Sequence, residues 1–198
     1  MKIKTLLSLG LIGLMFACSP TTKLEKSWAD PSFNMNTSKP FTKVLVVAPL
    51  KDANSQRIAE DKIVAELKKG GSVVSAVQSY TILNASDTDQ KQIEEKLTSA
   101  GFDGIILMHL KEVEKTTSYV QGSSYGGWYG YRNYSPGYYT EDKNFLAETN
   151  FYSLPGSKLL WSGTTSSLNP TSFDKTMDQI IYSIKSDLQK KGLIKKTK

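Results

Sequence analysis

Five residues in the middle of the chain match a motif known from catalytic serines. Gly122-Ser123-Ser124-Tyr125-Gly126 fits the pattern G-x-S-x-G, in which a strand precedes the serine and a helix follows it. Here a segment rich in glycine and tyrosine follows instead. The only histidine, His109, also precedes this serine, whereas α/β hydrolases have the order serine, acid, histidine. We therefore expect no serine hydrolase site.

A second partial motif begins at the same histidine. His109-Leu110-Lys111 is similar to the start of the H-x-K-x4-D signature of phospholipase D and cardiolipin synthase enzymes, but Thr116 stands where the aspartate belongs. That chemistry also needs two histidines, one that attacks and one that protonates, and this chain has one. His109 is better explained as a strand residue near a sheet edge. We assign no catalytic residue, and we predict that the chain is not an enzyme.

Residues suited to a metal, a cofactor or a nucleic acid are also lacking. With one histidine and one cysteine, zinc would depend on carboxylates, and Asp87 and Asp89 suit the start of a helix instead. Residues 51–55 lack the glycines that cradle phosphate. The lysines are not interleaved with aromatic residues, as a nucleic-acid surface would require. The sequence thus predicts no metal site, no cofactor and no nucleic-acid partner.

Cys18, the only cysteine, stands at the end of an export signal. Lys2 and Lys4 precede an apolar stretch, residues 6–16, that is too short to cross a hydrocarbon core of about 30 Å. Ala17 followed by Cys18 resembles a lipobox, in which the thiol receives a diacylglyceryl group before cleavage. We expect residues 1–17 to be a lipoprotein signal peptide and Cys18 to be the lipidation site and membrane anchor.

The alternative is an ordinary secretory signal with a free thiol at Cys18. Ser19, rather than aspartate, follows the cysteine, which by resemblance to other lipoproteins favours the outer membrane, on its periplasmic side.

The formal charge of +6 falls to +4 once the two lysines of the signal leave, and much of the remainder lies in the lysines of residues 190–198. The basic tail, residues 195–198, is either solvated or touches anionic lipid or peptidoglycan.

The rest of the chain predicts one α/β domain. Residues 18–41 are polar with scattered prolines, which indicates a flexible tether, and residues 42–194 form the domain. Apolar runs and helical periodicities predict, in order, strand 43–50, helix 55–69, strand 72–83, helix 86–100, strand 102–113, strands 145–153 and 158–166, and helix 172–191. This βαβαβ-β-β-α order predicts a two-layer or three-layer sandwich in which helices pack on a mixed sheet.

The succession of these elements carries a family resemblance. The segments KVLVVAPL, GFDGIILM and NFYSLPGSKLLWSGTT, with helices between and after them, resemble the domain shared by the TolB amino-terminal region, the curli-secretion lipoproteins and the LpoB-type activators of penicillin-binding proteins. The likeness covers residues 43–194. It implies a domain that binds proteins or assembles with copies of itself, without catalysis, and leaves the partner open.

The segment with most functional promise is the Tyr/Gly-rich loop of residues 119–143, expected between the third and fourth strands. Residues 119–139 hold seven of the ten tyrosines and five of the fourteen glycines. Aromatic side chains on a loose backbone suit the binding of sugars or proteins, whereas the alternative is a mobile hairpin whose aromatics fold back on the sheet. The residues we expect to contact a partner are Tyr125, Trp128, Tyr129, Tyr131, Tyr134 and Tyr138.

Two functions remain open from the sequence. The first is a lipid-anchored binding module of the cell envelope, with an envelope protein or peptidoglycan as its partner. The second is a structural subunit of an oligomeric envelope or secretion complex. The oligomeric state separates the two, and the sequence leaves it undetermined.

Overall fold

The computed structural model of the 198-residue chain describes residues 21–33, 41–70, 73–84, 89–120, 124–126, 132–134 and 138–194. Cys18, the signal peptide of residues 1–17 and the basic tail of residues 195–198 lie outside these ranges. What we predict for them therefore stays a prediction.

The centre of the structure is a six-stranded mixed sheet with the strand order β1-β8-β7-β4-β2-β3. Its strands are β1 (Thr22–Ala29), β2 (Phe41–Val47), β3 (Val73–Gln78), β4 (Gly104–Val120), β7 (Tyr138–Ser153) and β8 (Lys158–Leu168). The helices are α1 (Ala53–Gly70), the 3-10 helix Ser79–Thr81, α2 (Gln90–Ser99) and α3 (Phe173–Lys190). The short strands β5 (Ser124–Gly126) and β6 (Arg132–Tyr134) pair only with each other.

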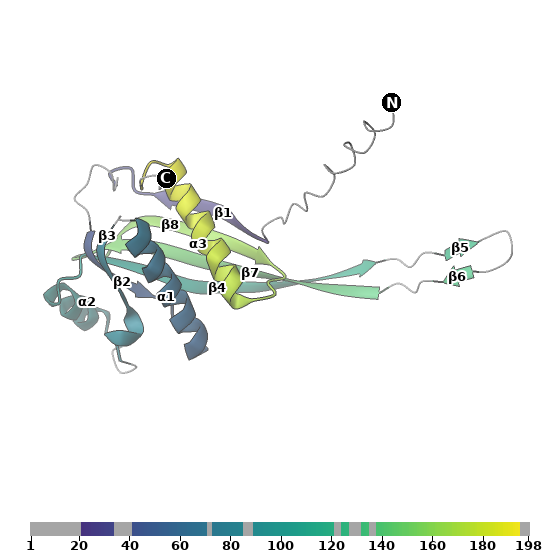
Figure 1. Cartoon of the computed structure of the whole chain (residues 1–198), viewed down its shortest axis with the longest axis horizontal. Helices are drawn as coiled ribbons and strands as arrows, with labels where there is room; N and C mark the ends of the chain where they lie inside the picture. The colour runs from purple at the N-terminus through teal and green to yellow at the C-terminus, as the bar shows by residue number, and fades with distance from the viewer. Residues whose placement is uncertain are drawn as a thin grey trace, which may run out of the picture.

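The connections of the parallel strands place the helices on both faces. β2 runs parallel to β3 on one side and to β4 on the other. Right-handed crossovers in these two opposite directions put α1 and α2 on opposite faces of the sheet. α3 lies beside α1 on the same face (Figure 1). The α/β sandwich on a mixed sheet is confirmed, and it has three layers.

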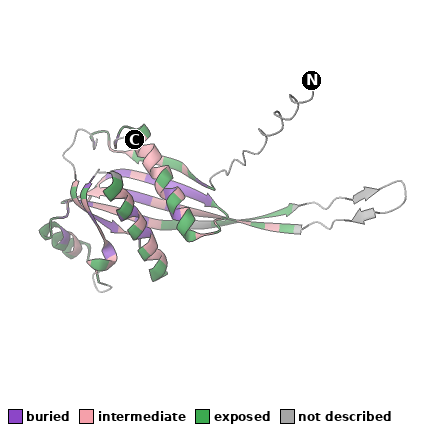
Figure 2. Ribbon diagram, in the orientation of Figure 1, coloured by how far each residue is buried: buried purple, intermediate pink, exposed green. Residues whose placement is uncertain are grey.

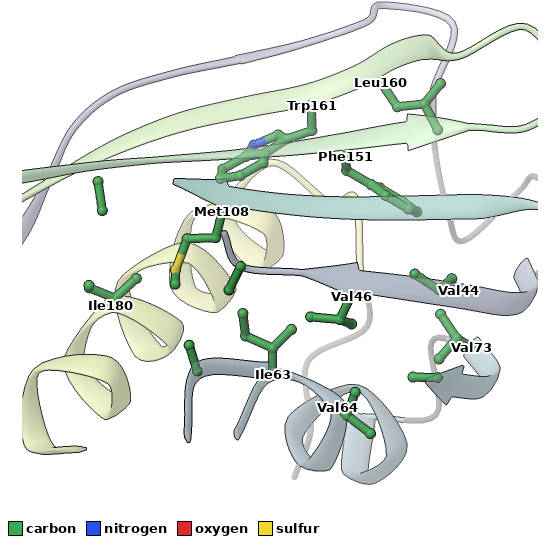
Figure 3. Close-up of a cluster of buried hydrophobic side chains, with 14 of the residues drawn as sticks. Val44, Val46, Ile63, Val64, Val73, Met108, Phe151, Leu160, Trp161 and Ile180 are labelled. Atoms are coloured by element: carbon green, nitrogen blue, oxygen red, sulfur yellow. The ribbon is translucent and has the colours of Figure 1, made fainter. Parts of the chain in front are cut away.

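The main core lies between the sheet and the pair α1 and α3. Met108 and Trp161 point from the sheet toward these helices, where they meet Ile63 and Ile180 (Figure 3). A smaller cluster on the other face joins α2 to the sheet through Leu45, Leu97, Phe102 and Leu154. The predicted stripe on the last helix is confirmed, because Met177 and Ile180 are buried against the sheet.

The predicted tether of residues 18–41 is wrong for Thr22–Ala29, which form the edge strand β1. This strand pairs antiparallel with β8, and a bulge interrupts the register between Leu24 and Lys26. Thr22 lies on the buried face before the bulge, and Ser27 and Ala29 lie on it after the bulge. The extra residue shifts the alternation of buried and exposed side chains by one position. No single period of two therefore runs through the segment, and the sequence pattern does not reveal the strand.

The strands that flank the Tyr/Gly segment are longer than predicted. The third predicted strand continues from Val113 to Val120, and the fourth begins at Tyr138 rather than at Phe145. The predicted loop of residues 119–143 is therefore wrong at both ends, where these residues belong to β4 and β7. The second predicted strand, residues 72–83, is too long, because β3 ends at Gln78 and the 3-10 helix begins at Ser79.

Asp30 fixes the end of β1 to the sheet. Its carboxylate pairs with Lys158 Nζ of β8 at 2.7 Å and accepts a hydrogen bond from the backbone N–H of Ser32 at 2.7 Å. The hydrogen bond with Lys158, followed by those with Ser32, lowers the pKa of Asp30 from 3.8 to about 2. The charged form is therefore favoured in the folded state.

We expect Asp30→Asn to destabilise the domain in a pH-dependent manner. A carboxyl group whose pKa falls on folding contributes stability above its unfolded pKa of 3.8, and this contribution disappears as the pH falls toward 2. Urea unfolding of the two proteins should differ at pH 7 and converge near pH 2. Glu25→Gln, which alters an exposed ion pair with Lys23 on the same strand, is the control. A constant difference across this pH range would contradict the assignment.

Candidate functional site

The candidate site is a two-stranded arm that extends beyond the sheet. The last pair between β7 and β8 is Asn144 with Leu168. Past this point β4 and β7 continue with each other alone, over residues 115–120 and 138–143. The arm leaves the side of the molecule opposite α2 (Figure 1), and most of its described side chains are exposed (Figure 2). We call these two segments the arm.

Cross-strand contacts hold the arm together. The rings of Tyr119 and Tyr139 are opposite each other with centroids 4.9 Å apart, and these side chains are 57% and 74% exposed. Lys115 Nζ lies 3.3 Å from Glu141 Oε1. Such pairs stabilise a ribbon by roughly 0.2–1 kcal/mol each, which leaves it close to marginal.

Asn169 braces the base of the arm. Its side chain accepts a hydrogen bond from the backbone N–H of Lys143 at 2.8 Å and donates one to Asp142 Oδ1 at 2.7 Å. Its backbone N–H also donates to the carbonyl of Lys143 at 2.8 Å. Asn169 has a φ of 45°, a conformation that asparagine tolerates better than most residues. These bonds fix the start of the arm on β7 to the residue that directly follows the end of β8.

The described part of the arm packs against no helix and no third strand. A two-stranded ribbon without a hydrophobic core is barely stable in water. The stability of the domain therefore does not explain why the arm is this long. Its exposed tyrosine pair offers rigid apolar faces with polar edges. The arm is thus suited to contact another molecule.

The structure places three of the six predicted contact residues on strands at the arm and beyond it. Tyr138 is the first residue of β7, opposite Val120, and Tyr125 and Tyr134 belong to β5 and β6. Their side chains lie outside the described part of the chain, as do Trp128, Tyr129 and Tyr131. Their role in binding stays a prediction. Tyr119 and Tyr139, which sequence reasoning did not single out, are the described aromatic pair of the arm.

The partial catalytic motifs sit in strands. His109 lies in β4 opposite Glu148 of β7, and Lys111 Nζ lies 3.3 Å from Glu148 Oε2. The hydrogen bond from Asn150, followed by the one from Lys111, lowers the pKa of Glu148. Ser124 lies in β5, and the next described element along the chain is the strand β6 and not a helix. Neither motif has the setting that its chemistry requires.

Glu60 is a buried carboxyl group that sequence reasoning missed. It lies on α1 and accepts hydrogen bonds from Ala48 N–H at 3.0 Å, from Ser79 Oγ at 2.7 Å, from Gln56 Nε2 at 3.1 Å and from Tyr80 N–H at 3.3 Å. The donors of Ala48, Ser79 and Tyr80 join the ends of β2 and β3 to the helix, whereas Gln56 lies on α1 itself. Because all the contacts are internal, Glu60 is a structural residue and not an exposed reactive group.

Two further observations concern the described residues alone. They contain no group of three or more histidines, cysteines and carboxylates close enough to hold a metal ion. No helix among them combines the length and the hydrophobicity needed to cross a bilayer.

Neither the scan against models of known protein families nor the search of curated proteins finds a match to this chain. Solved structures do align with it. PelC from Paraburkholderia phytofirmans, a dodecamer, aligns with a TM-score of 0.50 and 12% identity, over 85% of this chain and 97% of its own. Lipoprotein GNA1162 from Neisseria meningitidis gives a TM-score of 0.44 and 14% identity, over 75% and 99% of the two chains. TolB from Acinetobacter baumannii gives 0.39 and 13%, over 85% and 31%.

At 12% identity the alignment with PelC shows the fold alone. It supports the α/β sandwich that the order of strands and helices predicts, and it assigns no activity to this chain. The comparison thus supports the predicted fold, and no family is assigned.

Proposed function

We propose that the chain is a lipid-anchored protein of the bacterial cell envelope that acts without catalysis as an interaction module. Its anchor would be a lipid on Cys18, placed at the outer membrane on the periplasmic side. Its contact surface would be the arm together with the Tyr/Gly-rich residues between the two strands. Another envelope protein or peptidoglycan would be the partner.

The arm is the observation that carries this proposal. Six residue pairs extend past the last pair with β8, with an exposed tyrosine pair near the end. A ribbon of this kind gains little from the rest of its own fold, so a partner that orders it would supply the missing stabilisation. Among the described residues no group of three or more histidines, cysteines and carboxylates could hold a metal ion.

A second candidate function is that of a subunit in an oligomeric envelope or secretion complex. PelC, whose chain aligns over 97% of its length, is a dodecamer. The arm would then contact a neighbouring copy of the same chain instead of a different protein. Light scattering of the lipid-free protein at several concentrations separates the candidates: an oligomer supports the second, and a monomer that persists in a detergent control of the lipidated protein contradicts it.

Removal of the end of the arm, with its tyrosine pair and the residues between the two strands, tests the first candidate. In the variant, residues 119–139 are replaced by Asn-Gly, which suits a tight turn between the facing residues Ser118 and Thr140. We expect crosslinking in cells, followed by mass spectrometry, to lose the partners that the unaltered protein captures, while thermal unfolding of the domain stays nearly the same. The proposal fails if the folded variant captures the same partners.

A matched control separates the arm from aromatic surface in general. Tyr182 is 72% exposed on α3, far along the chain from the arm. Tyr182→Ser should leave the crosslinked partners unchanged. The double variant Tyr119→Ser, Tyr139→Ser should reduce them, because it removes the exposed ring pair and keeps the strands.

A further inference from the structure

An apolar pocket lies at the start of α3, where this helix meets β4, β7 and β8. Its volume is about 280 Å³. Nine of its fourteen lining residues are apolar, among them Leu110, Ala147, Phe173 and Ile180. The walls contain no acidic and no basic side chain apart from a single histidine, His109. We call this hollow the anchor-side pocket.

Large apolar side chains remain exposed at the pocket. Leu110 of β4 is 46% exposed and Phe173 of α3 is 38% exposed, and both line it. A single exposed leucine is ordinary on a protein surface. Two exposed side chains at one apolar hollow, however, form a surface from which an apolar group would displace water.

The described chain begins beside this pocket. Thr22 Oγ1 lies 2.8 Å from Oγ of Ser167, which lines the pocket. The carbonyl of Thr21 accepts a hydrogen bond from Leu168 N–H at 3.0 Å. Thr21 Oγ1 also donates to Gln179 Oε1 at 3.0 Å, and the next residue of α3, Ile180, is part of the pocket wall. The start of β1 is thus fixed to both elements that border the pocket.

Cys18 precedes Thr21 by three residues. Three residues span at most about 11 Å when extended, so the Cys18 sulfur can lie no farther than this, plus its own side chain, from the fixed Thr21. Acyl chains on that sulfur start within reach of the pocket.

We infer that the anchor-side pocket holds part of an acyl chain of the lipid on Cys18. This inference rests on the proposed lipidation of that residue. The pocket shields the acyl chain from water when the protein is out of the bilayer. When the acyl chain leaves the pocket, it can insert into a membrane. The acyl chain then has two positions, one in the pocket of the domain and one in the membrane.

Photocrosslinking of the full chain in cells tests this. Cells that express it receive a fatty acid bearing a diazirine, and after irradiation the purified protein is analysed by mass spectrometry. The intact mass shows whether Cys18 carries the lipid. We expect adducts that join the lipidated N-terminus to peptides containing Leu110, Ala147 or Phe173.

Three variants make the result specific. Ala147→Phe fills the pocket and should abolish the adducts. Leu110→Asn changes only a half-exposed wall residue and should reduce them several-fold even if the first variant fails to fold. Leu168→Asn alters a leucine that is 49% exposed on β8 and does not line the pocket, so it should leave the adducts unchanged.

The outcomes separate this inference from the proposed anchor. A chain without lipid on Cys18 would refute the anchor and the inference together. A lipidated chain without pocket adducts would refute the inference and leave the anchor intact. Undiminished adducts in Cys18→Ser would show that a free membrane lipid occupies the pocket, which also overturns the intramolecular arrangement.

Discussion

Replacing Glu60 by leucine is expected to lower the free energy of unfolding by about 3 kcal/mol or more, because each buried donor left without an acceptor costs roughly 1–3 kcal/mol. The lost acceptor serves three groups from other elements: Ala48 N–H, Ser79 Oγ and Tyr80 N–H. The first two donors are buried together with Glu60 itself. Water cannot replace the carboxyl oxygens there without opening the junction between β2, α1 and β3.

The measurement is urea unfolding of the purified domain at neutral pH. Glu60→Gln should cost less than the leucine variant, because an amide oxygen still accepts hydrogen bonds although its NH2 group faces one of the donors. Asp61→Asn is the matched control, since the neighbouring Asp61 accepts its hydrogen bonds from Gln78 and Tyr80 at the surface. Equal losses for Glu60→Leu and Asp61→Asn would contradict the structural role.

The elements of the core could be predicted because their residues repeat with a clear period. Val44, Leu45 and Val46 are all fully buried, as a continuous apolar run in a central parallel strand requires. The stripe through Met177 and Ile180 likewise predicted the last helix and the face that it buries. In both cases the signal lies within one element, so it can be found without knowledge of its neighbours.

Elements defined by distant neighbours could not be predicted in the same way. β1 is broken by its bulge, and its pairing with β8 joins residues more than 130 positions apart, such as Thr22 and Ser167. Glu60 lies beside the apolar stripe of α1, but its donors come from other segments. A glutamate in a helix is ordinarily solvated, so its burial becomes evident only when the ends of β2 and β3 are brought together.

The candidate site was predictable in composition and not in geometry. The density of tyrosine and glycine drew attention to the segment between β4 and β7, whose role as a contact surface stays a prediction. The extension of β4 over Glu114–Ser118 was missed because these residues are polar and exposed on both faces, which leaves no alternation to detect. Tyr119 lies opposite Tyr139 because of the bulge between Leu110 and Glu112, which shifts the pairing of β4 with β7 along the whole arm.

Gly163→Ala is expected to be the other severe substitution, at a cost of about 3 kcal/mol for overpacking a rigid core. A Cβ atom at Gly163 would lie 2.3 Å from Cη2 and 2.7 Å from Cζ2 of Trp161. The indole is almost fully buried and its Nε1–H donates to Asp187 Oδ2 of α3 at 3.3 Å. The ring therefore cannot move aside without disturbing the contact between β8 and α3.

A double-mutant cycle shows whether this crowding is the cause. Trp161→Phe removes part of the indole and should itself cost about 2 kcal/mol through the cavity that it leaves. In that background Gly163→Ala should cost at least about 1 kcal/mol less than in the unaltered protein, since the two residues compete for one space. Denaturant unfolding of the four proteins gives the coupling. Additive costs would show that Gly163 matters for its backbone and not for the indole that lies over it.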